Sequence, residues 1–161
     1  MHDAAYAFVA SVLGDVAGAR VLEFGARNVN GSVRALCGAC AAYHGVDIRP
    51  GPCVDEVADA AMYDGGGAYD VVLTTEMVEH APNPAACVRA AWRSLRPGGR
   101  LILTAAAPER APHGCDGGGV GGEHYAGIAP GALADWLAAW QDVRIVHAPA
   151  VGDVYATAVR P

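Results

Sequence analysis

Three acidic residues and a glycine-bounded loop, placed where predicted strands end, could bind a nucleotide. Glu23 ends the first predicted strand and is followed by the loop 25–31, which begins and ends with glycine. Backbone N–H groups in such a loop, just before a helix, attract an anionic group. Asp47 ends the second predicted strand, where its carboxylate can accept hydrogen bonds from both hydroxyls of a ribose. Asp59 follows the third strand, where an adenine amino group could donate to it. Ligands of parallel sheets bind at the carboxyl ends of the strands, so these residues are expected to share one site.

The glycine-rich segment 108–127 is the second concentration of reactive side chains. A loop of about 20 residues in a compact domain is usually a functional lid or a disordered segment. We interpret it as a substrate lid with glycine hinges, in which His113, His124 and Tyr125 contact the acceptor; a mobile loop without a role is the alternative. Its reactive residues are His113, Cys115, Asp116, Glu123, His124 and Tyr125.

Helical and strand periodicities alternate along the chain, which indicates a mostly parallel sheet. The fold class is therefore α/β. We expect a doubly wound, Rossmann-like, mostly parallel sheet with a C-terminal antiparallel hairpin, in a three-layer α/β/α arrangement. Helices are predicted over 3–17 and 33–42, from Asn83-Pro84 onward and from Pro130 onward, and strands over 20–24, 43–48, 53–58, 69–75, 100–106, 143–147 and 154–159.

The link between the second and third predicted strands is too short for the helix that normally joins parallel neighbours. It is the rigid turn 49–52, with the sequence RPGP. Either the third strand is vestigial or the chain crosses as an extended loop.

The helix predicted from Asn83-Pro84 onward has a clear start, because Asn83 can cap it and Pro84 suits its first position.

From the length of the chain we expect a single domain, residues 1–161. Of its 161 residues, 53% are hydrophobic and 17% are charged, which excludes intrinsic disorder. The net charge is −6, so no nucleic-acid partner is expected. Without a signal peptide or an apolar run long enough to span a bilayer, we expect a cytoplasmic protein with no membrane partner. Much of the apolar content is alanine, and a homodimer could complete so thin a core.

The order and spacing of these motifs resemble those of class I S-adenosylmethionine-dependent methyltransferases, in particular small, single-domain members of type 11. The resemblance rests on Glu23-x-Gly25, on Asp47 and Asp59, and on the stretches 74–84 and 95–103. It covers about residues 18–160. It implies the Rossmann-like fold of that family, with S-adenosylmethionine as cofactor and S-adenosylhomocysteine as product.

The resemblance also implies a role for each residue of the cofactor site. Glu23 would orient the amino group of the cofactor, the loop 25–31 would pass its methionine moiety, and Asp47 would hold the ribose hydroxyls. Ile48 would pack on the adenine face, Asp59 and Ala60 would meet the adenine edge, and Thr75 would border the methyl group. Most families have glycine where Arg27 stands, so either the loop is wider or Arg27 reaches the cofactor carboxylate. The full set is Glu23, Gly25, Ala26, Arg27, Asn30, Gly31, Asp47, Ile48, Asp59, Ala60 and Thr75.

The candidate catalytic residues are His80 and Glu76. Methyl transfer is an in-line displacement at a sulfonium, so the protein must hold the nucleophile in line with the S–CH₃ bond. Glu76 would border the methyl group. A hydroxyl nucleophile also needs a base, and His80 suits this role because imidazole titrates near pH 6.5; a structural role for His80 is the alternative.

A divalent metal is a further alternative at this stretch. In small-RNA 2′-O-methyltransferases, a segment similar to Glu76-x-x-Glu79-His80 helps to bind a metal, and here His113 and His124 would be available as further ligands. The same string occurs in relatives without a metal, so we assign no metal ligand.

We therefore expect methyl transfer to a small-molecule acceptor, with oxygen favoured over nitrogen as the atom methylated. One alternative is a non-catalytic module that binds S-adenosylmethionine or S-adenosylhomocysteine. Another is a nicotinamide-dependent oxidoreductase, which shares the sheet but needs glycine where Arg27 and Asn30 stand. The predicted C-terminal hairpin favours the methyltransferase.

Overall fold

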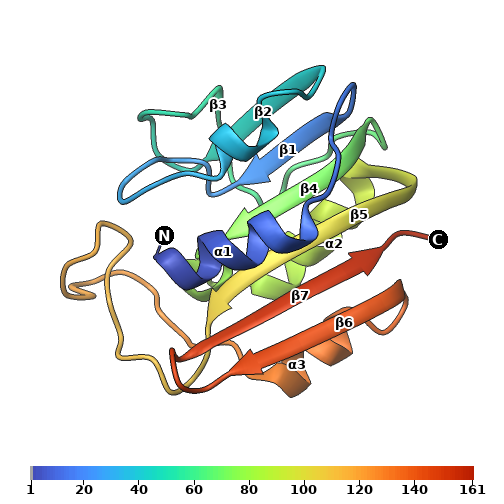
Figure 1. Cartoon of the computed structure of the whole chain (residues 1–161). Coiled ribbons are helices and arrows are strands. Elements are labelled where there is room, and N and C mark those ends of the chain that lie inside the picture. Colours follow the sequence, from blue (N-terminus) through green and yellow to red (C-terminus); the bar gives the residue numbers. More distant parts are fainter. Residues whose placement is uncertain (1) are drawn as a thin grey trace.

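A seven-stranded sheet organises the molecule (Figure 1). The computed structural model describes residues 2–161. The strand order is β3-β2-β1-β4-β5-β7-β6; β7 is antiparallel to both of its neighbours and the other pairs are parallel. The predicted fold class is confirmed. The strands are β1 (Arg20–Phe24), β2 (Ala42–Asp47), β3 (Glu56–Val57), β4 (Tyr69–Thr75), β5 (Leu95–Ala106), β6 (Gln141–Ala148) and β7 (Asp153–Val159).

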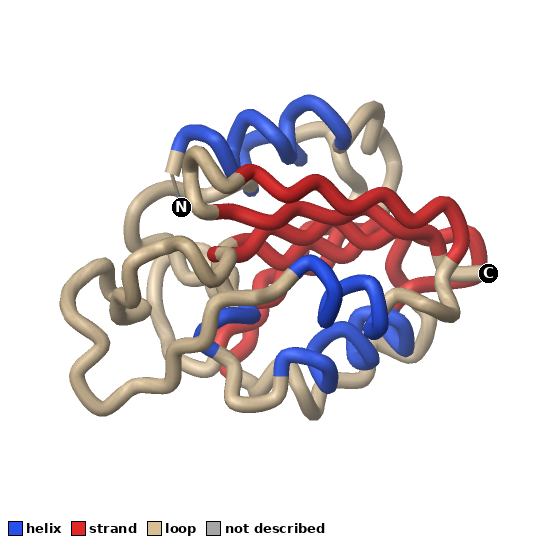
Figure 2. The backbone as a smooth tube through the Cα atoms, turned by 90° about the horizontal axis from the view of Figure 1, so that it is seen from below, coloured by secondary structure: helices blue, strands red, loops and turns tan. Residues whose placement is uncertain are grey.

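Helices cover both faces of the sheet, as Figure 2 shows: α1 lies on one face, and α2 and α3 lie on the other. Alternate residues of β5 supply the two cores, because successive side chains of a strand point to opposite faces. Ile102 packs in the cluster under α1, whereas Leu101 and Leu103 pack in the cluster that includes α2 and α3. Within residues 2–161, no helix combines the length and the apolar character needed to cross a membrane. The helices are α1 (Asp3–Val12), α2 (Pro84–Ser94) and α3 (Pro130–Trp136), with short 3₁₀ turns at Arg34–Cys37 and Val78–His80.

The helix predicted over 33–42 is wrong. That segment contains a single 3₁₀ turn, Arg34–Cys37, before β2 begins at Ala42. Its backbone hydrogen bonds run only three residues back, from the Leu36 N–H to the Val33 carbonyl and from the Cys40 N–H to the Cys37 carbonyl. Bonds of this spacing form tight 3₁₀-type turns and not an α-helix.

Helix α1 is shorter than predicted, since it ends at Val12 and not at residue 17. Gly14 and Gly18 both have positive φ angles, which turn the chain toward β1. By contrast, α2 begins as predicted, with the Asn83 side chain accepting a hydrogen bond from the Ala86 N–H at 3.1 Å.

The third strand is vestigial, which is one of the two outcomes that the short link allowed. β3 consists of two residues, Glu56 and Val57, paired with the end of β2. The connecting loop crosses directly over β2: a Cβ on Gly45 would overlap the Cys53 carbonyl oxygen, so only glycine fits there. The chain therefore passes from β2 to β3 without a helix.

Candidate functional site

A cavity of about 780 Å³ lies at the carboxyl ends of β1, β2 and β4, bordered by the loop 108–127. In Figure 1 this loop projects beyond that end of the sheet, where the N-terminus also lies. All eleven residues predicted for the cofactor site line the cavity, and so do Glu76, His80, His113 and His124. Tyr125 is not among the lining residues. The structure thus brings together residues from five separate stretches of sequence.

Glu23 links three neighbouring strands, β1, β2 and β4. Its carboxylate accepts hydrogen bonds from the Tyr43 hydroxyl at 2.5 Å and the Thr75 hydroxyl at 3.2 Å. The side chain is almost fully buried, and burial raises the pKa of Glu23 to about 7, although both hydroxyls favour its ionised form. A nearby cation would be a favourable partner for this carboxylate. Tyr43, which sequence reasoning missed, was indicated only as a residue of the second strand.

Gly25 turns the chain sharply out of β1. Its φ is +76°, and a Cβ there would overlap the side chain of Met77. The N–H groups of Gly25 and Ala26 both donate to the Val46 carbonyl, at 2.9 and 3.1 Å. Glycine at this position is therefore required both by the backbone conformation and by the close approach of Met77.

Asp47 holds two loops at the end of β2. Its carboxylate accepts hydrogen bonds from the backbone N–H groups of Arg27 at 3.2 Å and Arg49 at 2.9 Å. A carboxylate offers about four lone-pair sites, so Asp47 keeps acceptor capacity for a ligand. Next to it, the side chain of Ile48 lines the cavity and is 68% exposed. A large apolar side chain left open at a cavity wall suits a flat ring system.

The other end of the cavity carries a network of charges. Glu76 pairs with Arg110 and lies 3.4 Å from the His2 imidazole. Arg110 and His2 also contact the fully buried Asp153, at 3.3 and 2.8 Å, and Asp153 accepts a hydrogen bond from Tyr155 at 2.5 Å. The sequence indicated only a hairpin turn at Asp153. It contained no signal that His2 or Arg110 would face Glu76.

Glu79 and His80 follow β4 on a 3₁₀ turn. Glu79 is fully buried; one carboxylate oxygen accepts the Ala106 N–H at 3.0 Å, and the other has no partner. Burial and the neighbouring charge of Glu76 raise the pKa of Glu79. Burial and the proximity of His113 lower the pKa of His80, which keeps its ring neutral at neutral pH.

The ring of Tyr125 packs behind His80. Its centroid lies 5.5 Å from that of His80 and 4.9 Å from that of His113, each in an edge-on arrangement. Ligand atoms of Glu79, His80 and His113 come within 4.8 Å of one another, so these three residues are the candidate ligands for the metal alternative. Glu76, the other acid of that stretch, pairs with Arg110. Two other such groups, one around Asp153 and one around Glu123, already contain acids that pair with arginine.

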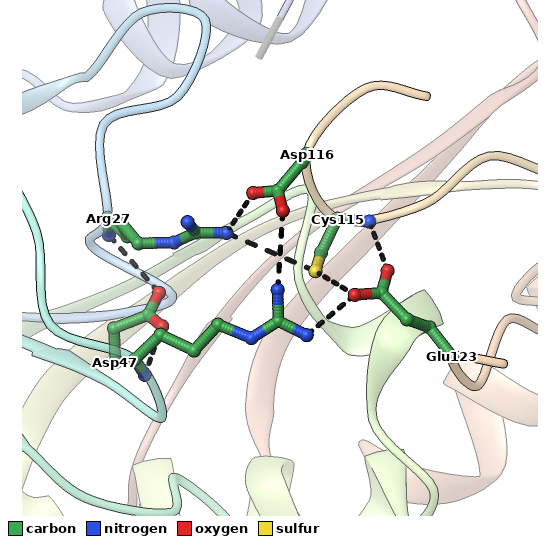
Figure 3. Close-up of polar contacts among 6 residues, drawn as sticks. Arg27, Asp47, Cys115, Asp116 and Glu123 are labelled. Carbon is green, nitrogen blue, oxygen red and sulfur yellow. Dashed lines mark hydrogen bonds and ion pairs between the residues drawn. The ribbon is translucent and has the colours of Figure 1, made fainter. Parts of the chain in front are cut away.

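Arg27 points across the cavity to the loop 108–127 (Figure 3). Its guanidinium pairs with Asp116 at 2.5 Å. Arg49 pairs with Asp116 at 3.4 Å and with Glu123 at 2.6 Å. Arg27, which stands where most families have glycine, thus connects the loop after β1 to the loop after β5.

Comparison with curated proteins shows the family of the chain. A family profile described as a methyltransferase domain matches residues 3–149. The ubiquinone biosynthesis O-methyltransferase of Xanthomonas oryzae pv. oryzae is 33% identical over 132 residues, which cover 72% of this chain and 54% of that protein. The chain spans about half the length of the first curated relatives it matches.

Solved structures share the fold. An S-adenosylmethionine-dependent methyltransferase from Mesorhizobium loti superimposes with a TM-score of 0.75 at 15% identity, over 98% of both chains. The 1,6-didemethyltoxoflavin-N1-methyltransferase of Burkholderia thailandensis, solved with 1,6-didemethyltoxoflavin and S-adenosylhomocysteine, gives a TM-score of 0.68 at 20% identity, over 98% of this chain and 76% of that one. The family match argues against the nicotinamide-dependent alternative and agrees with the resemblance read from the motifs. The chain belongs to the methyltransferase-domain family, with the fold of the class I S-adenosylmethionine-dependent enzymes.

Proposed function

We propose that this domain transfers the methyl group of S-adenosylmethionine to an oxygen atom of a small-molecule acceptor, leaving S-adenosylhomocysteine. The observation that carries the proposal is the pair Asp47 and Ile48 on the wall of one cavity. Asp47 presents a carboxylate with unused acceptor capacity, and Ile48 presents an open apolar surface. A ribose and the adenine attached to it need these two features side by side.

The remaining residues of the cavity fit the same cofactor. A volume of about 780 Å³ lies within the roughly 300–1,000 Å³ usual for ligand pockets. Glu23, buried beside Gly25, would gain a favourable partner in the ammonium group of a bound amino-acid moiety. When bound, the cofactor supplies a methyl group on a positively charged sulfur. The protein's part is to bind, to orient and to exclude water.

The acceptor would lie at the charged end of the cavity, near Glu76 and His80. Because its pKa is lowered, the His80 imidazole is free to take a proton from an acceptor hydroxyl as the oxygen is methylated. Its Nδ1 is buried and has no partner in the structure. Such a base favours oxygen as the methylated atom, and the names of the curated relatives, which are O-methyltransferases, support the same choice.

Calorimetric titration with S-adenosylmethionine, S-adenosylhomocysteine and NADH, each with and without Mg²⁺, tests the cofactor part. We expect micromolar binding of the two sulfur compounds and none of NADH. Failure to bind either sulfur compound would overturn the proposal. A dependence of binding on Mg²⁺ would instead assign Glu79, His80 and His113 to a metal site.

An acceptor screen that follows formation of S-adenosylhomocysteine tests the second part, using matched phenols and anilines. We expect turnover with hydroxyl acceptors. Turnover with amines alone would show that the assignment to oxygen is wrong. Cofactor binding without turnover of any acceptor would favour the non-catalytic binding module.

A further inference from the structure

We propose that Arg27 and Arg49 are positioning residues that hold the loop 108–127 closed over the cofactor, through Asp116 and Glu123. We call these four residues the lid latch and the loop 108–127 the lid. The proposal rests on the proposed function for the identity of the ligand beneath the lid. The latch itself is read from contacts within the chain.

The latch joins segments that are distant in sequence, as Figure 3 shows. Arg27 and Asp116 are 89 positions apart, and their side chains meet at 2.5 Å. Arg49 reaches both lid acids, Asp116 at 3.4 Å and Glu123 at 2.6 Å. Two arginines thus share two carboxylates, so loss of either arginine leaves a lid acid with fewer charge partners.

Asp47 fixes the backbone from which both latch arginines extend. Its two carboxylate oxygens each accept one N–H, from Arg27 and from Arg49. The residue proposed to hold the ribose therefore also sets the starting points of the two side chains that cross to the lid. Cofactor binding and lid closure share this one anchor.

Glu123 joins the two arms of the lid, that is, the segments on either side of its glycine-rich tip. Besides Arg49, it accepts hydrogen bonds from the Cys115 N–H at 2.9 Å and from the Cys115 thiol at 3.1 Å. The charge of Arg49 and these bonds lower the pKa of Glu123 to about 2, so the carboxylate stays ionised at physiological pH. The tip between the arms is unpacked: a Cβ on Gly118, Gly119, Gly121 or Gly122 would meet no atom within 4 Å.

A lid fastened mainly by ion pairs should open when those pairs are weakened. The latch side chains are partly exposed, from 18% for Arg27 to 61% for Asp116, so salt will screen them. Opening exposes the cavity, and a bound ligand then dissociates faster. The latch should therefore control the dissociation rate of the cofactor more than its association rate.

Two measurements test the proposal, one of which needs no ligand. Hydrogen exchange of the amides in 113–124 is measured on the ligand-free wild type, on Arg49→Gln, on Glu123→Arg and on the charge-swapped double variant Arg49→Glu/Glu123→Arg. Arg144→Gln, an exposed substitution on β6, is the matched control. We expect about tenfold faster exchange of the lid in the single variants, and partial recovery in the charge-swapped variant.

The dissociation rate of S-adenosylhomocysteine, measured by stopped flow on the same set, is the second readout. It should rise about tenfold in Arg49→Gln and in the wild type at 1 M salt, and it should stay unchanged in Arg144→Gln. Wild-type exchange in Arg49→Gln, or a charge-swapped variant no better than either single variant, would overturn the latch. Absence of S-adenosylhomocysteine binding by the wild type would overturn the proposed function instead, and the exchange data would still decide the latch.

Discussion

Asp47→Ala is expected to weaken binding of S-adenosylhomocysteine while the domain stays folded. In the structure, the Asp47 carboxylate already accepts two hydrogen bonds, from the N–H groups of Arg27 and Arg49. About two positions remain for the ribose hydroxyls. The substitution would remove the bonds that we propose to the ribose. It also releases the two loops that border the cofactor.

The size of the effect follows from the charge on the acceptor. Hydrogen bonds to a charged group contribute about 1.5–3 kcal/mol each. Asp47 is half-buried, so water will take the place of part of what is lost. We take the net loss as that of a single such bond, about 1.5–3 kcal/mol, which corresponds to a dissociation constant about 10- to 150-fold higher.

Calorimetry with S-adenosylhomocysteine measures this change, and thermal unfolding verifies that the variant is folded. Asp64→Ala is a matched control. The Asp64 carboxylate accepts a hydrogen bond from the Gly66 N–H at 3.0 Å, just as the Asp47 carboxylate accepts one from the Arg49 N–H at 2.9 Å, but Asp64 does not line the cavity. An affinity for Asp47→Ala within twofold of the wild type would refute the placement of the ribose across the end of β2. An equal loss in Asp64→Ala would refute the argument from the cavity.

Three further predictions concern pH, catalysis and helix stability. Burial raises the pKa of Glu23 from 4.5 to about 7. The free energy of unfolding of the wild type, relative to that of Glu23→Gln, should therefore be greatest below about pH 4.5, fall by roughly 3 kcal/mol as the pH rises to about 7, and stay level above. Urea titrations that show a constant difference across this range would contradict the raised pKa. His80→Asn should lower kcat with a hydroxyl acceptor by about 10²- to 10⁴-fold while calorimetry shows unchanged cofactor affinity; an unchanged kcat would make His80 structural. Asn83→Ala should cost about 1 kcal/mol in urea unfolding through loss of the α2 cap, whereas no loss would mean that Pro84 alone starts the helix.

The elements that depend on local signals were predictable from the sequence. The bounds of β1 and β4 agree with the prediction, because each is a short apolar run rich in branched residues between clear breaks. The start of α2 follows from a capping residue and a proline. Because the carboxyl ends of parallel strands lie at one edge of a sheet, the sequence could place the acids Glu23, Asp47 and Asp59 around one cavity.

Features that depend on tight turns were not predictable from periodicity. The segment 33–41 has apolar residues at helical spacing, yet its hydrogen bonds run only three residues back and it forms a 3₁₀ turn. At the end of α1, Gly14 with its positive φ outweighed the apolar pattern that continues past it.

The pairing and the burial of the charged residues in the site were decided by the tertiary structure alone. Arg110 meets Glu76 across 34 positions of sequence, and Arg27 meets Asp116 across 89. The raised pKa of Glu23 likewise depends on what buries it. A local pattern determines which residues form a strand or start a helix, because those choices depend on neighbours a few positions away. Ion pairs and desolvation depend on which distant segments the sheet brings together. They are therefore determined by the whole fold.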